Sequence, residues 1–290
     1  RTAAAYLIAT YTVAVVRACG LVGISRNVFA YRKKTREETL REQIKQLAKE
    51  HYRWGYRLLF NYIRRLGENA NHKKFLRIYR EEHLQIGKRS RRKERRFDRI
   101  KSEEPKGINE RWSMDFMYDV LENKRSYRIL NVIDDHSREC LCCEVSRSFG
   151  GYDVAEALEK LISRYGNPKV IKSDNGAEFR SRYMEKWSKE RGITLEFTRP
   201  GKPTENGQIE SFNGTMRNEL LRGIEFESVM EARAELEKWR EKYNNERPHS
   251  ALNYEPPSSR RHPHGGDGKE NKLETTKPIN NNITQVNLLP

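Results

Sequence analysis

Two hydrophobic patterns divide the chain into an N-terminal and a C-terminal part. In the C-terminal part, alternating or continuous apolar runs predict strands at residues 112–118, 127–133, 141–145, 169–172 and 194–198. Apolar residues at helical spacing predict helices at residues 152–165, 181–191, 205–221 and 229–247. Three consecutive strands followed by alternating helices and strands are typical of a mixed α/β sheet with helices on both faces.

The N-terminal part has a helical pattern only. Residues 15–34 predict a helix, a short turn and a second helix that is capped by Ser25 and carries Arg26 and Arg32. This arrangement is typical of a helix-turn-helix reader of DNA, although plain packing explains such a helix pair as well. Three further apolar helix faces follow between residues 39 and 79.

The segment HYRWGYRLL mixes aromatic residues with arginines, and two interpretations of its rings are open. Trp54 and Tyr56 are able to stack on nucleic-acid bases. Large aromatic side chains also supply much of the buried apolar area of a protein core. The second interpretation is the one that the pattern favours for these two rings.

Charge narrows the class of partner. The 290 residues include 57 Lys and Arg against 41 Asp and Glu, a net charge of +16. Such an excess favours a polyanion, with nucleic acid ahead of a membrane surface. Nine basic and two acidic residues fall within residues 88–101, among them Arg91 and Arg92. This block predicts a linker, an arm that binds DNA with a strong dependence on salt, or both.

Three features bear on the compartment and on the completeness of the chain. The opening apolar stretch AAAYLIATYTVAVV is shorter than the roughly 20 residues of a membrane-spanning helix and lacks the flanks of a secretory signal. Cys140, Cys142 and Cys143 lack the paired spacing of a zinc site, so we expect buried thiols and a reducing cytoplasm. The chain begins with Arg1 rather than Met, which indicates a fragment or the downstream part of a frameshift product.

Three acids form the candidate catalytic set. Asp115 lies inside a predicted strand, Asp174 follows another, and Glu210 lies on a predicted helix. The two intervals between them contain 58 and 35 residues. Mg²⁺ and Mn²⁺ are hard cations that prefer oxygen ligands, and phosphoryl transfer often uses two of them to clamp the attacking and leaving oxygens. Three carboxylates are therefore the residue type that such a site requires.

The surroundings of two of these acids support the choice. Asn175 and Gly176 follow Asp174 at the end of a strand, a pair that is suited to a tight turn. On the helix, Asn213 and Arg217 lie three and seven residues after Glu210 and share its face, with Arg217 about 10 Å further along the axis. Arg217 would there meet a phosphate. Lys202, in the Gly- and Pro-containing loop of residues 199–207, is a second phosphate candidate, unless this loop is a simple connector.

Other acids and both notable histidines have simpler interpretations. Asp119 fits a solvated turn after a strand, and Asp134 and Asp135 fit an Asx-type turn between two strands. His136 and His249 have no partner at metal-ligand spacing, so we expect structural roles for them.

The segments WSMDF, NVIDDHSR, KSDNGAEF and RPGKPTENGQIESFNGTMRNELL resemble those of OrfB-type transposases of insertion-sequence family 3, which are relatives of the retroviral integrases. The resemblance covers residues 17–256 and includes the spacing of the three acids, which is that of the DDE motif, while residues beyond 258 depart from it. It implies a ribonuclease H-like α/β fold, the integrase catalytic core, in which the first and fourth strands lie side by side. It also implies two Mg²⁺ or Mn²⁺ ions, DNA as partner, and a homo-oligomer on that DNA. A bacterial cytoplasm and association with the nucleoid follow from the same resemblance. The segment NNERPHSAL resembles the one that closes the catalytic domain of the family.

Pattern and resemblance together predict five regions. These are a helix-turn-helix-like segment (residues 1–35), a helical DNA-binding region (36–87), a basic linker (88–107), the catalytic core (108–257) and a disordered tail (258–290). The function expected from this organisation is that of a DDE transposase, which cleaves and transfers DNA strands. A non-catalytic DNA-binding derivative and a ribonuclease H-like nuclease without strand transfer are the alternatives. Candidate DNA contacts, besides the acids, are Arg217, Lys202, Asn175, Asn213, Arg26, Arg32, Arg91 and Arg92.

Overall fold

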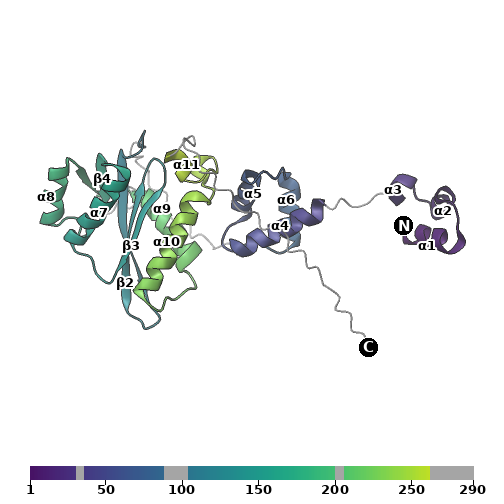
Figure 1. The fold of residues 1–290 in the computed structure, drawn as a ribbon, viewed down its shortest axis with the longest axis horizontal. Coiled ribbons are helices and arrows are strands. Elements are labelled where there is room, and N and C mark those ends of the chain that lie inside the picture. The colour runs from purple at the N-terminus through teal and green to yellow at the C-terminus, as the bar shows by residue number, and fades with distance from the viewer. Residues whose placement is uncertain (31–35, 88–103, 200–205, 262–290) are drawn as a thin grey trace, which may run out of the picture.

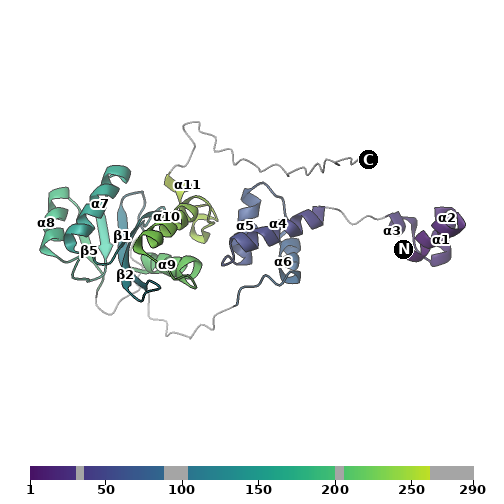
Figure 2. The ribbon, with the colours of Figure 1, turned by 60° about the horizontal axis from the view of Figure 1, so that its bottom comes forward.

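The computed structural model describes residues 1–30, 36–87, 104–199 and 206–261 of the 290-residue chain. Within these ranges, helices alone form the N-terminal part, and helices cover both faces of one sheet in the C-terminal part (Figures 1 and 2). Among all the residues that the structure describes, no helix has both the length and the apolar character that a membrane crossing requires.

The first three helices form a small group at one end of the molecule (Figure 1), namely α1 (Thr2–Tyr11), α2 (Val15–Val22) and α3 (Arg26–Ala30). Gly23 ends α2 with φ at 71°, a left-handed conformation that glycine adopts readily. Ser25 Oγ accepts a hydrogen bond from the backbone N–H of Val28 at 3.2 Å, which confirms the predicted cap. Residues 31–35, which include Arg32, lie outside the described residues.

Three further helices, α4 (Arg36–Glu50), α5 (Tyr56–Arg65) and α6 (His72–Glu81), share one core. The predicted apolar faces meet in it through Leu40, Ile44, Leu59, Ile63, Phe75 and Ile78. Trp54, which is 6% exposed, belongs to this core and stacks on His51 with ring centroids 3.8 Å apart. Tyr56 packs against the same cluster, so the core interpretation of both rings is confirmed.

The C-terminal part is built on a five-stranded sheet with strand order β3-β2-β1-β4-β5. Its strands are β1 (Arg111–Val120), β2 (Ser126–Asp134), β3 (Cys140–Ser146), β4 (Val170–Ser173) and β5 (Thr194–Phe197). The first three form an antiparallel meander, while β4 and β5 run parallel to β1. The predicted mixed sheet and the expected neighbourhood of the first and fourth strands are both confirmed.

The register of β1 and β4 decides where their acids lie. Ser113 is paired with Lys172 in the parallel ladder. Asp115 and Asp174 each lie two residues further along their chains. Because parallel strands advance at nearly the same rise per residue, this register brings the two acids to the same level of the sheet.

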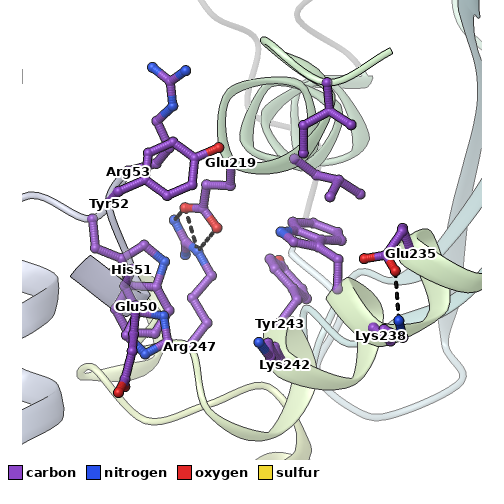
Figure 3. A pocket seen from close by; sticks show the side chains of 14 residues that line it. Glu50, His51, Tyr52, Arg53, Glu219, Glu235, Lys238, Lys242, Tyr243 and Arg247 are labelled. Atoms are coloured by element: carbon purple, nitrogen blue, oxygen red, sulfur yellow. Dashed lines mark hydrogen bonds and ion pairs between the residues drawn. The ribbon is translucent and has the colours of Figure 1, made fainter. Parts of the chain in front are cut away.

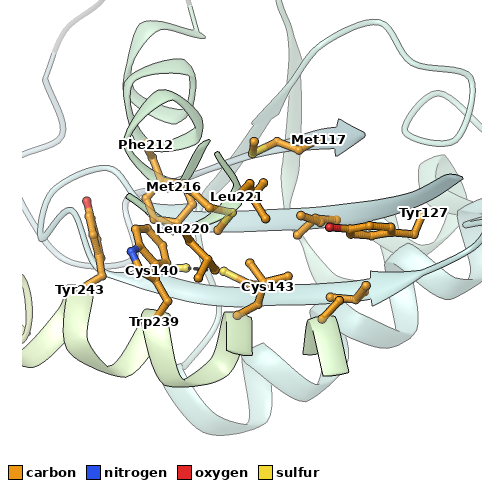
Figure 4. Close-up of a cluster of buried hydrophobic side chains, with 14 of the residues drawn as sticks. Met117, Tyr127, Cys140, Cys143, Phe212, Met216, Leu220, Leu221, Trp239 and Tyr243 are labelled. Carbon is orange, nitrogen blue, oxygen red and sulfur yellow. Dashed lines mark hydrogen bonds between the residues drawn. The ribbon is translucent and has the colours of Figure 1, made fainter. Parts of the chain in front are cut away.

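Helices cover the two faces of the sheet with separate cores. On one face, α7 (Gly151–Tyr165) and α8 (Arg182–Arg191) pack against residues such as Trp112, Leu130 and Ile171. On the other face lie α9 (Gly207–Met216) and α10 (Val229–Asn245). Figure 4 shows this second core, in which Phe212, Met216, Trp239 and Tyr243 face the sheet residues Met117, Tyr127, Cys140 and Cys143. The four cysteines are free thiols, and all but the half-buried Cys142 are buried.

The helix predicted over residues 205–221 differs from the structure. It begins as α9 at Gly207 and continues from residue 217 as a π-helix, η2 (Arg217–Leu221). Leu220 and Leu221 are buried against the sheet in this π-helix. A π-helix inserts one residue into a turn, and the periodicity of apolar residues over so short a stretch does not distinguish it from an α-helix.

Asp134 organises the turn between β2 and β3. Its Oδ1 atom accepts hydrogen bonds from the backbone N–H groups of His136 at 3.0 Å and Ser137 at 2.7 Å. Asp135 forms an ion pair with Arg111 at 2.5 Å. The predicted Asx-type turn is therefore confirmed. Asp119, by contrast, lies within β1 rather than in a turn after it.

Candidate active site

Asp115, Asp174 and Glu210 reach the site from three different elements. Asp115 is half-buried in the middle of β1, Asp174 is exposed directly beyond β4, and Glu210 is exposed in the first turn of α9. Ile209 and Phe212, on either side of Glu210, are buried against the sheet and hold this turn in place. The fold therefore presents one carboxylate from each of two neighbouring strands and one from a helix packed on them.

The electrostatics of Asp115 link the three acids. Burial, followed by the negative charges of Asp174 and Glu210, raises the pKa of Asp115 to about 6. Hydrogen bonds from the Phe116 backbone N–H and from Asn213 act in the opposite direction. Burial also raises the pKa of Glu210. Because two separate carboxylates act on Asp115, all three groups lie within one electrostatic environment.

Two asparagines connect Asp115 to the interior. Asn213 Nδ2 donates a hydrogen bond to Asp115 Oδ2 at 2.8 Å. Asn131 Nδ2, on β2, donates to Asn213 Oδ1, also at 2.8 Å. Asn131 is fully buried, so this chain of bonds fixes α9 to the sheet at the level of Asp115. The apolar run ILNVID contains this asparagine, and a polar residue inside a buried strand is the signal that the sequence analysis did not use.

The turn after β4 determines the direction of Asp174. Its Oδ1 atom accepts a hydrogen bond from the Gly176 backbone N–H at 2.9 Å. A Cβ atom at Gly176 would lie 3.0 Å from this same oxygen, so the tight turn favours glycine. Asn175 Nδ2 donates to the Thr198 carbonyl at 2.6 Å, which joins the ends of β4 and β5.

The donor chemistry of the three acids fits a divalent metal ion, because all of their potential ligand atoms are carboxylate oxygens. Among residues 1–30, 36–87, 104–199 and 206–261, however, no group of three or more His, Cys, Asp or Glu side chains is arranged as a metal-ligand cluster. Asp115 uses both of its carboxylate oxygens in the hydrogen bonds described above, and Asp174 uses one. Like charges also repel, so a cation between the acids would be required for a closer approach.

The candidate DNA contacts are distributed over several elements. Arg217 is exposed, and its Nη2 atom lies 3.4 Å from the Tyr118 carbonyl near the end of β1. Arg26 is exposed on α3. Both polar ends of the Asn213 amide are engaged within the protein, so a DNA contact through this side chain stays an untested prediction. The remaining basic candidates fall outside the described residues, namely Arg32, Arg91, Arg92 and Lys202.

Both histidines have structural surroundings. His136 Nδ1 lies 3.0 Å from the Pro105 carbonyl oxygen. Burial, together with the positive charges of Arg247 and Arg138, lowers the pKa of His249 to about 4. His249 belongs to the closing segment NNERPHSAL, in which Asn244 accepts from and donates to the backbone of Cys140 at 2.9 and 2.8 Å. This segment thus fixes the start of β3.

A cavity of about 200 Å³ lies between the loop after α4 and the helices η2 and α10 (Figure 3). None of the three acids lines it. Near this cavity, Arg53 Nη2 donates to the Arg222 carbonyl at 3.2 Å, and Arg65 Nη1 donates to the Glu246 carbonyl at 3.1 Å. The cavity therefore marks a contact between the helical part and the sheet part, at a place separate from the acids.

Comparisons with known proteins agree with this geometry. The family described as Integrase core domain matches residues 105–203 and again residues 191–257. The chain is 42% identical over 244 residues to the 31.7 kDa protein of insertion element IS407 from Burkholderia multivorans, a match that covers 83% of this chain and 88% of that protein. It is 38% identical to the 39.2 kDa protein of insertion element IS476 from Xanthomonas euvesicatoria, covering 83% and 70%.

Among solved structures, the chain is similar to one in the simian T-cell lymphotropic virus intasome in complex with PP2A regulatory subunit B56 gamma, with 18% identity, a TM-score of 0.49 and coverage of 79% of this chain and 78% of that chain. The family of this chain is assigned from its sequence relatives and from the two matches to the Integrase core domain. The mixed sheet, with helices on both faces and an all-helical part before it, agrees with that core. The chain belongs to the insertion-sequence transposases with an integrase core domain, within the polynucleotidyl transferase superfamily.

Proposed function

We propose that the protein is a DDE transposase that cleaves the DNA ends of its insertion sequence and joins them to target DNA with the help of two Mg²⁺ or Mn²⁺ ions. The observation that carries this proposal is geometric: Asp115 and Asp174 lie at the same level of the sheet, and Asn213, on the helix of Glu210, donates a hydrogen bond to Asp115. These acids are separated by 58 and 35 residues in the sequence. The β1–β4 register and the packing of α9 on the sheet support this site, and bound cations would draw the three carboxylates into the closer arrangement that phosphoryl transfer requires.

Each part of the site has a role in this proposal. When bound, the divalent cations would stabilise the attacking and leaving oxygens of the phosphodiester. Asp115, Asp174 and Glu210 would hold them through carboxylate oxygens, and Asn213 would keep Asp115 directed toward them. The protein would act by positioning and charge neutralisation, without a covalent protein intermediate.

The basic residues would bind the DNA backbone. Arg217 stands at the end of the helix that carries Glu210, and it would contact a phosphate near the acids. In this proposal residues 1–35 and 36–87 recognise the element ends, residues 88–107 connect them, and residues 108–257 form the catalytic core. The further contacts proposed are Lys202, Asn175, Arg26, Arg32, Arg91 and Arg92. Two distant DNA ends must be joined in one reaction, which supports a homo-oligomer on DNA in the bacterial nucleoid.

One experiment distinguishes this function from its alternatives. The protein is incubated with Mg²⁺ and labelled DNA that carries candidate element ends, and both nicked and joined products are measured. Joined products that disappear in Asp115→Asn, Asp174→Asn and Glu210→Gln support the transposase, because each change removes one ligand charge while phosphate contacts persist. Nicks without joining would indicate a nuclease. Retardation of DNA without any cleavage would indicate a non-catalytic DNA-binding derivative.

A further inference from the structure

An arginine with a mostly buried side chain lies next to the strand that carries Asp115 but is not part of the acid set. Arg128 is on β2, directly opposite Tyr118 of β1. Its side chain is only 14% exposed. The guanidinium carbon lies 4.0 Å from the centre of the Phe116 ring and 4.9 Å from the centre of the Tyr118 ring. Arg128 is therefore held by stacking on the two aromatic residues that follow Asp115 along β1.

The charged end of the same side chain holds the loop that follows β4. Arg128 Nη1 donates to Glu178 Oε1 at 2.5 Å, and this interaction lowers the pKa of Glu178. Glu178 lies four residues after Asp174. Its neighbour Phe179 stacks on Phe116 with ring centroids 4.8 Å apart and an interplanar angle of 8°. Two contacts thus fasten this loop to the sheet. Phe179 reaches Phe116 of β1, and Glu178 reaches Arg128 of β2.

We propose that Arg128 is a positioning residue, which clamps the loop carrying Asp174 onto the strand carrying Asp115. The backbone ladder between β1 and β4 ends at Ser113 and Lys172, so the two acids lie beyond the last paired residues. Hydrogen bonding between β1 and β4 therefore does not reach Asp174. The Arg128–Glu178 pair provides a tie between β2 and the loop just where the ladder no longer does.

This positioning role explains why residue 128 is an arginine. A guanidinium is planar, so it stacks on Phe116 while its edge still donates to Glu178. A lysine at this position would keep the charge but would lose the stacked plane. Arg128 Nε is buried without a hydrogen-bond partner among the described residues. Its geometry therefore depends on the stack and on the single ion pair, so that the loss of either one should loosen the loop.

The expected effect of Arg128 on catalysis rests on the proposed function. The effect of Arg128 on the loop after β4 is measured without any assay of activity. Hydrogen–deuterium exchange of the full chain is compared for wild type, Arg128→Met, Arg128→Lys and Glu178→Gln. We expect faster exchange in the peptide over residues 174–180 in all three variants, with Arg128→Met the fastest. Arg191→Met is the matched control, because Arg191, the last residue of α8, forms its ion pair at 2.6 Å with Glu159 of α7 and not with the loop. It should leave that peptide unchanged.

Cleavage provides the second measurement. Outer residues that orient metal ligands typically change metal affinity by about 10- to 100-fold when altered. We expect Arg128→Met to raise the Mg²⁺ concentration for half-maximal cleavage by roughly tenfold. The KM for DNA should change little, and Arg128→Lys should recover part of the loss. If wild type does not cleave DNA, the proposed function fails while the exchange result still decides the clamp.

Two results would overturn the clamp. One is an unchanged exchange rate of residues 174–180 in both Arg128→Met and Glu178→Gln. The other is an increase spread evenly over the sheet, which would make Arg128 a general stabilising residue. If Arg128→Met does not fold, Glu178→Gln decides the question alone, because it keeps the size of the side chain and one acceptor oxygen while it removes the negative charge.

Discussion

Arg247 and Glu219 form a bidentate ion pair that joins the residues after α10 to the π-helix after α9. The Arg247 Nη2 atom lies 2.7 Å from Glu219 Oε1, and Arg247 Nε donates to both carboxylate oxygens at 2.9 and 3.0 Å. The two side chains are only 14% and 10% exposed. The pair thus fixes the far end of the helical segment that begins with Glu210, and it is drawn at the edge of the cavity in Figure 3.

Breaking this pair should destabilise the protein strongly. Arg247→Met leaves the Glu219 charge buried without its partner, and such losses typically lower the free energy of unfolding by about 3–5 kcal/mol. Urea denaturation of wild type and variant measures the difference. Glu156→Gln removes an exposed ion pair with Lys160 and should change stability by less than about 0.5 kcal/mol. Equal effects of the two substitutions would show that burial of the pair is unimportant.

Asn213 should matter for both stability and chemistry. Asn213→Ala removes the donor to Asp115 and leaves the buried Nδ2 of Asn131 without its partner. We expect a loss of about 1–3 kcal/mol in the free energy of unfolding and a reduced rate of strand cleavage. Thermal denaturation and single-turnover cleavage measure the two effects. Asn218→Ala, at an exposed position of the following π-helix, is the control and should change neither.

Arg217 should contribute to DNA placement and not to metal binding. Arg217→Ala is expected to lower strand transfer at saturating DNA, while Mg²⁺ affinity measured without DNA stays nearly unchanged. Arg217→Lys should restore part of the activity, because a point charge binds phosphate without the bidentate fork. Arg125, exposed in the β1–β2 connection, provides the control Arg125→Ala. Equal joining by all variants and wild type would remove Arg217 from the site.

His249 should make the fold sensitive to acid. Its pKa is lowered from 6.5 to about 4 in the folded protein, so the unfolded state binds more protons between these values. The stabilising effect is complete above pH 6.5 and is lost as the pH falls toward 4. Between pH 7.5 and pH 5, we expect His249→Gln to lose about 2 kcal/mol less stability than wild type. Urea denaturation at both pH values tests this, and parallel losses in the two proteins would contradict it.

The sequence by itself determined the local parts of this protein. Apolar periodicity located the strands and most helices, because side chains alternate across a strand and repeat every 3.6 residues around a helix. The turn at Asp134, the cap at Ser25 and the candidate acids follow from residue types at short range. These features depend on neighbours in the chain, which the sequence contains directly.

The tertiary structure alone decided which distant residues meet. The adjacency of β1 and β4, expected only from the resemblance, brings Asp115 and Asp174 to one level. Arg240, on the helix predicted over residues 229–247, is a charged residue that is only 7% exposed and forms an ion pair with Glu237. The physical reason is combinatorial. With 57 basic and 41 acidic residues, the sequence permits many pairs of similar energy, and only the packing of the sheet and helices selects Arg128 with Glu178 or Arg247 with Glu219.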